Sequence, residues 1–341
     1  MPGYANVLAF RKAQAKIEAV RGTAETTMTR WLTVLQSGGI AATYTRDRED
    51  APETLRSFQG DRDTALTNES VTIAIEARLS HEEVPWWMSM ALKGGTSTRT
   101  GTTTGSTPPG YTYTITPSDT ADDLDTFTLK MGDGATCYVY RRVAVNSMTL
   151  RCNPNAGGEA TWRISLDCIA IFVGVSTFDT ATDISRTMVQ SNGSKMYMDT
   201  TTIGTTQVQN KLRNFSVTVA NNIEEKRFVE SGITAAADFG RGLQRITGDF
   251  TIEHLDDTTF ALMRANTKQK IRFEQTGAAI GATPTTNYLL QVDIPQAALN
   301  APSESYAGQN LVYTYPFLGE KPVGSSAITV KDVNALATVI A

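Results

Sequence analysis

An internal repeat is the feature of this sequence that most constrains its fold. Residues 215–220 match residues 40–45 at an offset of 175, and residues 246–254 match residues 71–79 at the same offset. Self-similarity at one fixed spacing indicates that one structural unit occurs twice along a chain. The sequence therefore predicts two consecutive domains of one architecture, each of about 150 residues and able to bury its own core.

The repeated runs alternate apolar and polar residues, which is the pattern of half-buried β-strands. In residues 71–79, one face would carry Val71, Ile73, Ile75, Ala77 and Leu79, and the other Thr72, Ala74, Glu76 and Arg78. Similar runs predict strands over 40–45, 111–115, 127–131, 137–145, 147–152 and 159–169. Threonine, which is β-branched and suits a pleated, half-wet surface, accounts for fifty of the 341 residues. The expected fold class is mainly β (α+β), with two tandem β-sandwich or barrel domains.

One helix is predicted to interrupt the strands of each copy. In the first copy the signals are, in order, Ser80 or His81 as the cap, Glu82, Glu83 and Pro85 in the first turn, Trp86, Trp87 and Met90, and Gly94-Gly95 as the stop. In the second copy the helix is expected over 255–264. A tryptophan pair can mark a binding site, but the spacing of Trp86 and Met90 favours the core face of a helix that lies on a sheet.

The repeat also suggests where the domains begin and end. Residues 308–317 match 158–167 at an offset of only 150, so the first copy carries about 25 extra residues after its helix. We expect an N-terminal arm (1–22), a first domain (23–172) with a Thr-rich loop (94–126), a linker (173–199), a second domain (200–320) and a C-terminal arm (321–341). Arms of this kind are often ordered only on a neighbouring molecule.

Composition excludes several classes of protein. The formal net charge of −4 argues against a dedicated duplex-DNA binder, which needs a concentrated basic face. No apolar run reaches the roughly 18–20 residues that span a bilayer, and residues 1–20 lack the apolar core of a signal peptide. Cys137, Cys152 and Cys168 are odd in number and lack C-x-x-C spacing. They are expected to be reduced strand residues, not disulfides or zinc ligands.

No catalytic, cofactor or metal site is predicted. The only two histidines, His81 and His254, take nearly equivalent places in the two copies, which favours structural capping over acid–base catalysis. The sequence contains no H-E-x-x-H, no G-x-S-x-G, no Walker loop and no G-x-G-x-x-G that opens a helix after a strand. The aspartates between Asp119 and Asp125 lack the glycine and distal glutamate of a calcium loop. We therefore do not expect an enzyme.

Four runs carry a resemblance to a known family: residues 17–24 (IEAVRGTA), 111–118 (YTYTITPS), 126–130 (TFTLK) and 145–150 (VNSMTL). In their order, and together with the repeat, they resemble the tail tube proteins of siphoviruses, in particular the larger members with two repeats. The resemblance spans about residues 15–320, although Val20 and Arg21 stand where the family more often has threonine and an aromatic residue.

The resemblance implies a structural virion protein of the phage tail. Each copy would be a tail-tube domain with one flanking helix, and six such domains would form a ring whose inner strands make a continuous barrel of about 24 strands. A chain with two domains would reach this ring as a trimer with pseudo-sixfold symmetry. Rings would stack into the major tail tube, which conducts DNA and tape measure protein.

The resemblance also implies the partners. These would be further copies of the chain, the tape measure protein in the lumen, and the tail terminator and tail tip proteins. Double-stranded DNA would pass through without specific binding, and no membrane and no cofactor would be involved. The chain would be assembled in the host cytoplasm and reside in the virion. Two alternatives remain open: a tail terminator or collar protein, and a Thr-rich β adhesin that binds carbohydrate or a receptor.

Two sets of residues are candidates for function. DNA must slide through a tube, so the lumen is expected to be acidic or neutral, with Thr72 and Glu76 on its surface. The segments 46–70 and 221–245 link the matched runs and are expected to mediate ring stacking. Their candidate residues are Arg48, Glu49, Asp50, Glu53, Arg56, Phe58, Asp61, Arg62, Glu224, Glu225, Lys226, Arg227, Phe228 and Glu230.

Overall fold

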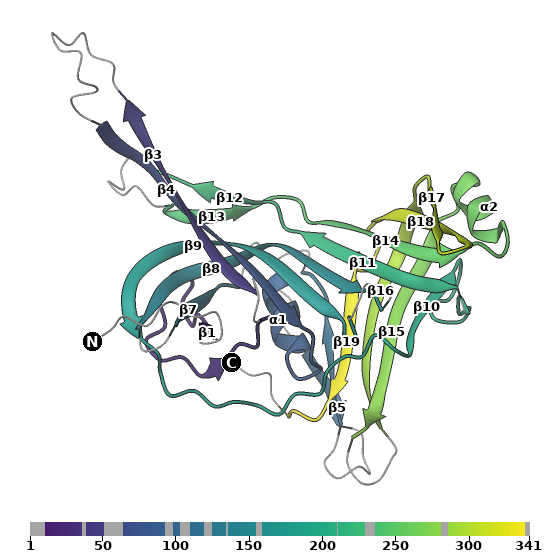
Figure 1. The fold of residues 1–341 in the computed structure, drawn as a ribbon, viewed down its shortest axis with the longest axis horizontal. Coiled ribbons are helices and arrows are strands. Elements are labelled where there is room, and N and C mark those ends of the chain that lie inside the picture. The colour runs from purple at the N-terminus through teal and green to yellow at the C-terminus, as the bar shows by residue number, and fades with distance from the viewer. Residues whose placement is uncertain are drawn as a thin grey trace.

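Long antiparallel strands make up most of the chain in the computed structural model (Figure 1). The structure describes residues 11–35, 39–50, 64–92, 98–102, 110–118, 125–133, 136–154, 159–209, 211–228, 236–280 and 286–337. Within these residues there are two helices and many strands, so the expected mainly β fold class is confirmed.

Eight strands follow one another in a single sheet, which we call the wall sheet. In spatial order they are β3 (Ile40–Asp50), β4 (Thr64–Arg78), β9 (Arg163–Thr177), β8 (Thr136–Cys152), β11 (Leu212–Ala220), β14 (Arg245–Glu253), β18 (Asn310–Gly319) and β17 (Ser303–Ala307). The first four come from the first half of the chain and the last four from the second. The pairing of β8 with β11 therefore joins the two halves.

The remaining strands form outer layers on the wall sheet. In the first half, β1 (Arg11–Ile17) pairs with β2 (Arg30–Trp31) and β7 (Phe127–Asp133), and β7 pairs with the beginning of β8. In the second half, β10 (Ser194–Asp199) pairs with β15 (Gln269–Ala279), and β15 with β16 (Asn287–Leu299). The strands β5 (Thr98–Thr102), β6 (Tyr111–Ile115) and β19 (Thr329–Asn334) continue the layer from β16, and β12 (Ile223–Lys226) and β13 (Asp238–Arg241) form a separate hairpin.

The two halves share a strand register. Ile40 lies opposite Ile75 between β3 and β4, and Phe215 lies opposite Phe250 between β11 and β14. Both partners are displaced by 175 residues, the offset found in the sequence. Between β4 and β9 on one side, and β14 and β18 on the other, the registers correspond at offsets of 175 and 149. The sequence match at 150 was therefore one residue out for β9 and β18.

Several predicted boundaries differ from the observed elements. The strands expected over 137–145 and 147–152 form one strand, β8, which bends between layers at register shifts near residues 141–147; Arg142 has a positive φ of 50° there. The expected linker begins inside β9 and ends in β10, and the expected arms supply β1 and β19 to the chain's own layers. The Thr-rich segment contains the paired strands β5 and β6.

The first helix, α1 (Val84–Ala91), is wholly buried and starts later than predicted. Its N-cap position is Glu83, because the residues before it make other contacts. His81 is buried against Asp332 of β19, at 2.9 Å from Nδ1 to the carboxylate oxygen. The Glu82 carboxylate accepts a hydrogen bond from the backbone of residue 187, and Glu83 forms buried ion pairs with Arg30 and Arg186.

The tryptophan pair belongs to the core, as its spacing indicated. The rings of Trp86 and Trp87 are 4.6 Å apart, Phe127 lies 5.3 Å from Trp86, and the Arg30 guanidinium lies over the Trp86 ring at 4.5 Å. The second helix, α2 (Thr258–Arg264), is much more exposed. Its Phe260, which matches Trp86 in the sequence, has 36% of its surface exposed, whereas Trp86 has none.

This difference in burial predicts unequal costs of truncation. Trp86→Ala removes a fully buried ring and leaves a cavity beside a buried arginine, so it should lower the free energy of unfolding by about 3–5 kcal/mol. Phe260→Ala, the matched control, should cost less than about 2 kcal/mol because the ring is already partly in water. Urea unfolding followed by tryptophan fluorescence would compare them, and equal losses would contradict the assigned packing.

Candidate assembly surfaces

One face of the wall sheet is polar. Along β4, Val71, Ile73 and Ile75 are buried, while Thr72 and Ala74 are exposed and Glu76 is half-buried. The register carries this alternation across the sheet, so that one face gathers Thr43, Thr72, Glu76, Ser165, Asp167, Ser147, Thr149, Ser216, Thr218, Thr247 and Asp249. We call it the polar face. Thr72 and Glu76, the two lumen candidates, both lie on it.

Charges on the polar face are paired within the sheet. The guanidinium groups of Arg151 and Arg163 both contact the Glu76 carboxylate, and both also contact Glu159 at 3.3–3.4 Å. Asp167 accepts a hydrogen bond from the Ser147 hydroxyl at 2.9 Å. Such partly exposed ion pairs add little stability. Their effect is electrostatic, because the charges of Arg151 and Arg163 are neutralised by the neighbouring carboxylates of Glu76 and Glu159.

The wall sheet has one free edge at each end. In the described part of the chain, β3 pairs with β4 alone and β17 pairs with β18 alone. The two matched strands β3 and β11 differ in exposure. Tyr44 of β3 is 44% exposed, whereas its counterpart Val219, on β11 beside β8, is 0% exposed. All the residues of β17 are exposed or half-buried. An uncovered edge presents a row of backbone donors and acceptors to another strand.

The direction of these backbone groups follows from two hydrogen bonds. Glu76 donates its N–H to the carbonyl of Gly39 at 2.7 Å, so Gly39 is bonded to β4. In an antiparallel pair, alternate residues direct their backbone groups toward and away from the partner strand. Because Gly39 faces β4, the N–H groups of Ala42 and Tyr44 point away from β4. The second half agrees with this. Asn221 donates its N–H to the Asn146 carbonyl at 2.7 Å, so the residues of β11 that correspond to Ala42 and Tyr44 direct their backbone groups toward β8.

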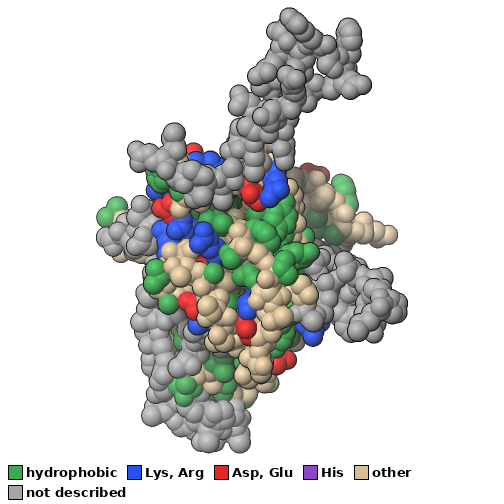
Figure 2. Space-filling view, turned by 90° about the vertical axis from the view of Figure 1, so that its left-hand side faces the viewer, with side chains coloured by type: hydrophobic (Ala, Val, Ile, Leu, Met, Phe, Trp, Pro, Cys, Tyr) green, Lys and Arg blue, Asp and Glu red, His purple; other side chains and the backbone are tan. Residues whose placement is uncertain are grey.

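An aromatic cluster lies under the free edge of β3. The hydroxyls of Tyr44 and Tyr140 are 2.8 Å apart, and Phe172 meets Tyr44 edge-on at 5.6 Å. Burial raises the pKa of the Tyr44 hydroxyl and outweighs the effect of its hydrogen bond with Tyr140, so the phenol stays neutral. Val173 and Val175 are exposed on the same strand as Phe172. Figure 2, which views this side, shows apolar side chains beneath the projecting hairpin.

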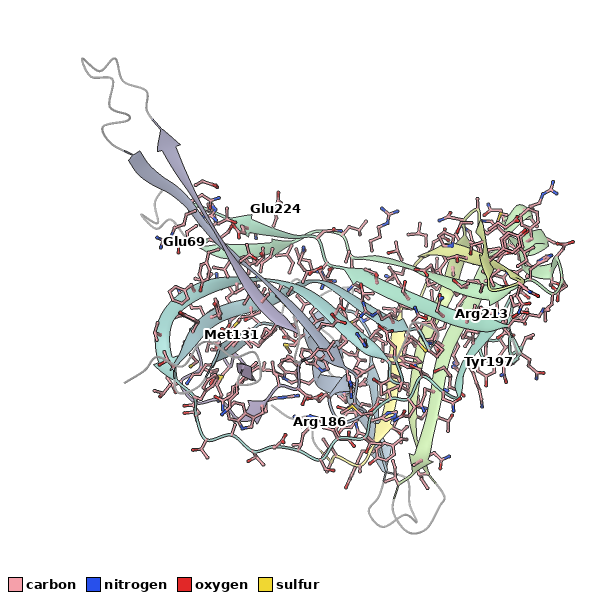
Figure 3. All side chains as sticks on the ribbon, viewed as in Figure 1. Glu69, Met131, Arg186, Tyr197, Arg213 and Glu224 are labelled. Carbon is pink, nitrogen blue, oxygen red and sulfur yellow. The ribbon has the colours of Figure 1, made fainter. Side chains whose placement is uncertain are left out.

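The two segments expected to mediate stacking are neighbouring β-hairpins. One is the outer part of β3 and β4, and the other is β12 with β13; Figure 1 shows both running toward the same corner of the molecule. Glu69 and Glu224 mark them in Figure 3. The Arg227 guanidinium donates to the Glu69 carbonyl at 3.0 Å, and Arg46 pairs with the Glu69 carboxylate at 3.2 Å.

The β12–β13 hairpin is also fastened to the first half of the chain. Ile223 and Phe239 pack in a small core with Ala144 and Ile171 of β8 and β9, and Arg21 contacts Asp238 at 3.2 Å.

The structure places only some of the stacking candidates. Glu224, Glu225 and Lys226 lie on β12, Arg227 follows it, and Phe228 is exposed. Arg48, Glu49 and Asp50 are placed as backbone of β3. The other candidates lie outside the described residues: Glu53, Arg56, Phe58, Asp61, Arg62 and Glu230.

The chemistry of the described residues is that of packing and pairing. Among them, no group of three or more His, Cys, Asp or Glu is placed to hold a metal ion. No helix in the described part of the chain is long and apolar enough to cross a membrane. Cys137, Cys152 and Cys168 are free and buried, and burial raises the pKa of the Cys168 thiol.

Sequence reasoning found the polar face but missed the free edges. The edges are made of backbone groups, which every residue carries, so no motif marks them. The one available signal was the repeat itself, since two matched units placed side by side must meet along an edge.

A family model described as phage tail tube protein matches residues 11–320, which is most of the chain. A comparison with curated proteins found no match.

Proposed function

The chain belongs to the phage tail tube protein family, and from this we propose that it is the major tail tube subunit of a siphovirus, a phage with a long flexible tail. A protein of this family is a structural part of the virion tail that assembles with its own copies into a polymer, and it is not an enzyme. The finer proposal is that two tube domains, related by duplication, occur in each chain. Three chains then form a ring with pseudo-sixfold symmetry.

The pairing of β8 with β11 is the observation that carries this proposal. It joins the fourth wall strand of the first half to the first wall strand of the second half. The two free edges of the wall sheet are strands of the same two kinds. β3 is the counterpart of β11, and β17 lies beside β18 as β8 lies beside β9. Pairing β17 of one copy with β3 of the next repeats the inner junction between chains. A head-to-tail contact of this kind closes into a ring where its rotation divides a full turn, and we propose that three copies close it.

The strand count and the polar face fit a conducting channel. Eight wall strands in each of three copies give about 24, and barrels of 16–18 strands already leave an aqueous channel. The apolar face is covered by α1 and the outer layers, so the polar face would line the lumen. Its hydroxyls are uncharged, and the Glu76 carboxylate next to Arg151 and Arg163 weakens the attraction of these two arginines for DNA phosphates.

We further propose the partners and the place of assembly. The tape measure protein and then DNA would pass through the lumen without specific binding, and the tail terminator and tail tip proteins would end the tube. Assembly would occur in the host cytoplasm, before the tail joins the virion. The two neighbouring hairpins, 46–70 and 221–245, would contact the next ring, because β3–β4 and β12–β13 run toward the same corner of the molecule in Figure 1.

Blocking the β3 edge should prevent ring closure. Ala42→Pro removes an N–H that points away from β4, so the monomer should fold while the pairing with β17 of the next copy is lost. Ala42→Thr, which keeps the N–H at the same position, is the matched control. Native mass spectrometry should show trimers for the control and monomers for the proline variant. Trimers of the proline variant would exclude this edge from the junction.

Cysteine labelling should locate the polar face in the assembled tube. Thr72→Cys places a thiol on that face, and Thr276→Cys places one on an exposed position of β15 in the outer layer. The three native cysteines are buried and should not react. With maleimide-linked nanogold, electron microscopy of tubes should show density on the axis for the first variant and outside for the second. The reverse pattern would mean that the polar face points outward.

Shortening the projecting hairpin should separate ring formation from stacking. Deleting residues 48–63 leaves residues 64–67 as a loop between the paired Asp47 and Asn68, so β3 and β4 keep their inner pairing. The variant should give soluble trimers and no long tubes in negative-stain microscopy. Normal tubes would contradict the stacking role. Single rings from the unaltered protein at high concentration would instead favour a terminator or collar protein.

A further inference from the structure

A short segment of the first half acts as an added strand, which we call the strap (residues 186–190). Val189 donates its N–H to the carbonyl of Leu79 at 2.9 Å and accepts a hydrogen bond from the N–H of Trp162 at 2.9 Å. Its side chain is fully buried. The strap therefore crosses the ends of β4 and β9 and completes their backbone hydrogen bonding.

The strap also covers the start of α1. His81 donates its N–H to the carbonyl of Thr187 at 3.0 Å, and Thr187 donates its N–H to the Glu82 carboxylate at 2.7 Å. Arg186, labelled in Figure 3, contacts the buried Glu83 carboxylate at 3.1 Å. The helix is buried on this side because the strap lies on it.

The second half has a corresponding site, formed by His254 and Leu311, which we call the seat. His254 donates its N–H to the carbonyl of Leu311 at 3.0 Å, as Leu79 donates to Trp162 at 2.9 Å. The two pairs are related by 175 and 149 residues, the offsets that relate the wall strands themselves. In the described part of the chain, no segment is bonded to His254 and Leu311 in the way that Val189 is bonded in the first half.

Exposed apolar side chains surround this second seat. Leu255, the residue after His254, is 62% exposed, whereas its counterpart Ser80 is bridged to Met188 of the strap and buried. Phe260 of α2 is partly exposed, and Tyr306 is exposed on β17, opposite Leu311. These are the positions that a strap would cover.

We propose that the seat is filled by a second copy of this chain, through the residues that precede its β1. The inference rests on the proposed ring. In the first half, the strap precedes β10, which pairs with β15; residues 1–10 precede β1, which pairs with β7 in the same arrangement. A strap for the second half must come from a segment that stands before such a strand, and in a head-to-tail ring that is the N-terminal segment of the next copy.

The chemistry of the N-terminal segment and the place of β1 after it fit the seat. Residues 1–10 carry no charged side chain and include Tyr4, Val7, Leu8 and Phe10, comparable with Met188 and Val189 of the strap. In Figure 1, β1 lies in the left-hand half of the molecule and α2 at its right-hand end. In the proposed head-to-tail ring, the segment before β1 of one chain would therefore meet the seat of the previous chain. This contact is separate from the pairing of β3 with β17.

A photo-crosslinker at the seat tests the proposal. p-Benzoylphenylalanine replaces Phe260 in the full chain, and the same substitution at Phe228, exposed on the stacking hairpin, is the control. Rings are assembled from a mixture of nitrogen-15-labelled and unlabelled chains. Mass spectrometry should then find mixed-isotope crosslinks between position 260 and the peptide containing residues 1–11, and none to that peptide from position 228.

The outcomes separate the two proposals. Rings whose position 260 crosslinks within its own chain, to another segment, or not at all would overturn the strap and leave the tube function intact. Failure of the unaltered protein to form rings would overturn both. As a second measurement, deleting residues 2–8 should raise the trimer dissociation constant by about tenfold or more. An unchanged constant would also contradict the strap, whereas Ala42→Pro acts on the other contact.

Discussion

Backbone pairing between β8 and β11 is the interaction on which the rest of the structure depends. Buried backbone N–H and C=O groups must find partners, so a sheet that ends in solvent carries an unused row of them. Inside the chain, six paired positions between Ser147 and Cys152 of β8 and residues 215–220 of β11 satisfy that row. At β3 and β17 it stays open. The β8–β11 pairing thus shows, within one chain, the kind of contact that the edge strands β3 and β17 lack.

The two halves share a register but are not equally complete. In the first half, α1 is covered by the strap, β6 and β19, and Trp86 has no exposed surface. In the second half, no described segment covers α2 in this way, and Leu255 and Phe260 are exposed to water. The extra burial explains why two large tryptophans are placed on one helix and a single phenylalanine on the other. With the proposed strap contact, the second half would reach the same state beside another copy.

The sequence predicted those features that repeat or alternate locally. The faces of β4 and the offset of 175 came directly from side-chain patterns, and the observed register agrees. The start of α1 was missed because Glu82 and Glu83, which look like first-turn residues, bind Thr187, Arg30 and Arg186 from distant segments. The pairing of Arg151 with Glu76 depends on β4, β9 and β8 lying side by side. No local pattern encodes that order.

The two halves of the chain are held together by two separate strand pairings, and this bears on the proposal that each chain supplies two domains to the ring. In the wall sheet the lock is β8 with β11; in the outer layer, β19 pairs with β6 of the first half on one side and with β16 of the second half on the other. Asp332 of β19 also holds His81 in the core. A ring of six separate domains must form six contacts between molecules, each opposed by lost translational and rotational freedom. In the proposed ring, a locked pair would reduce that number to three. The segment with β6 and the C-terminal strand β19 would then hold the two halves rigidly together before the ring is assembled.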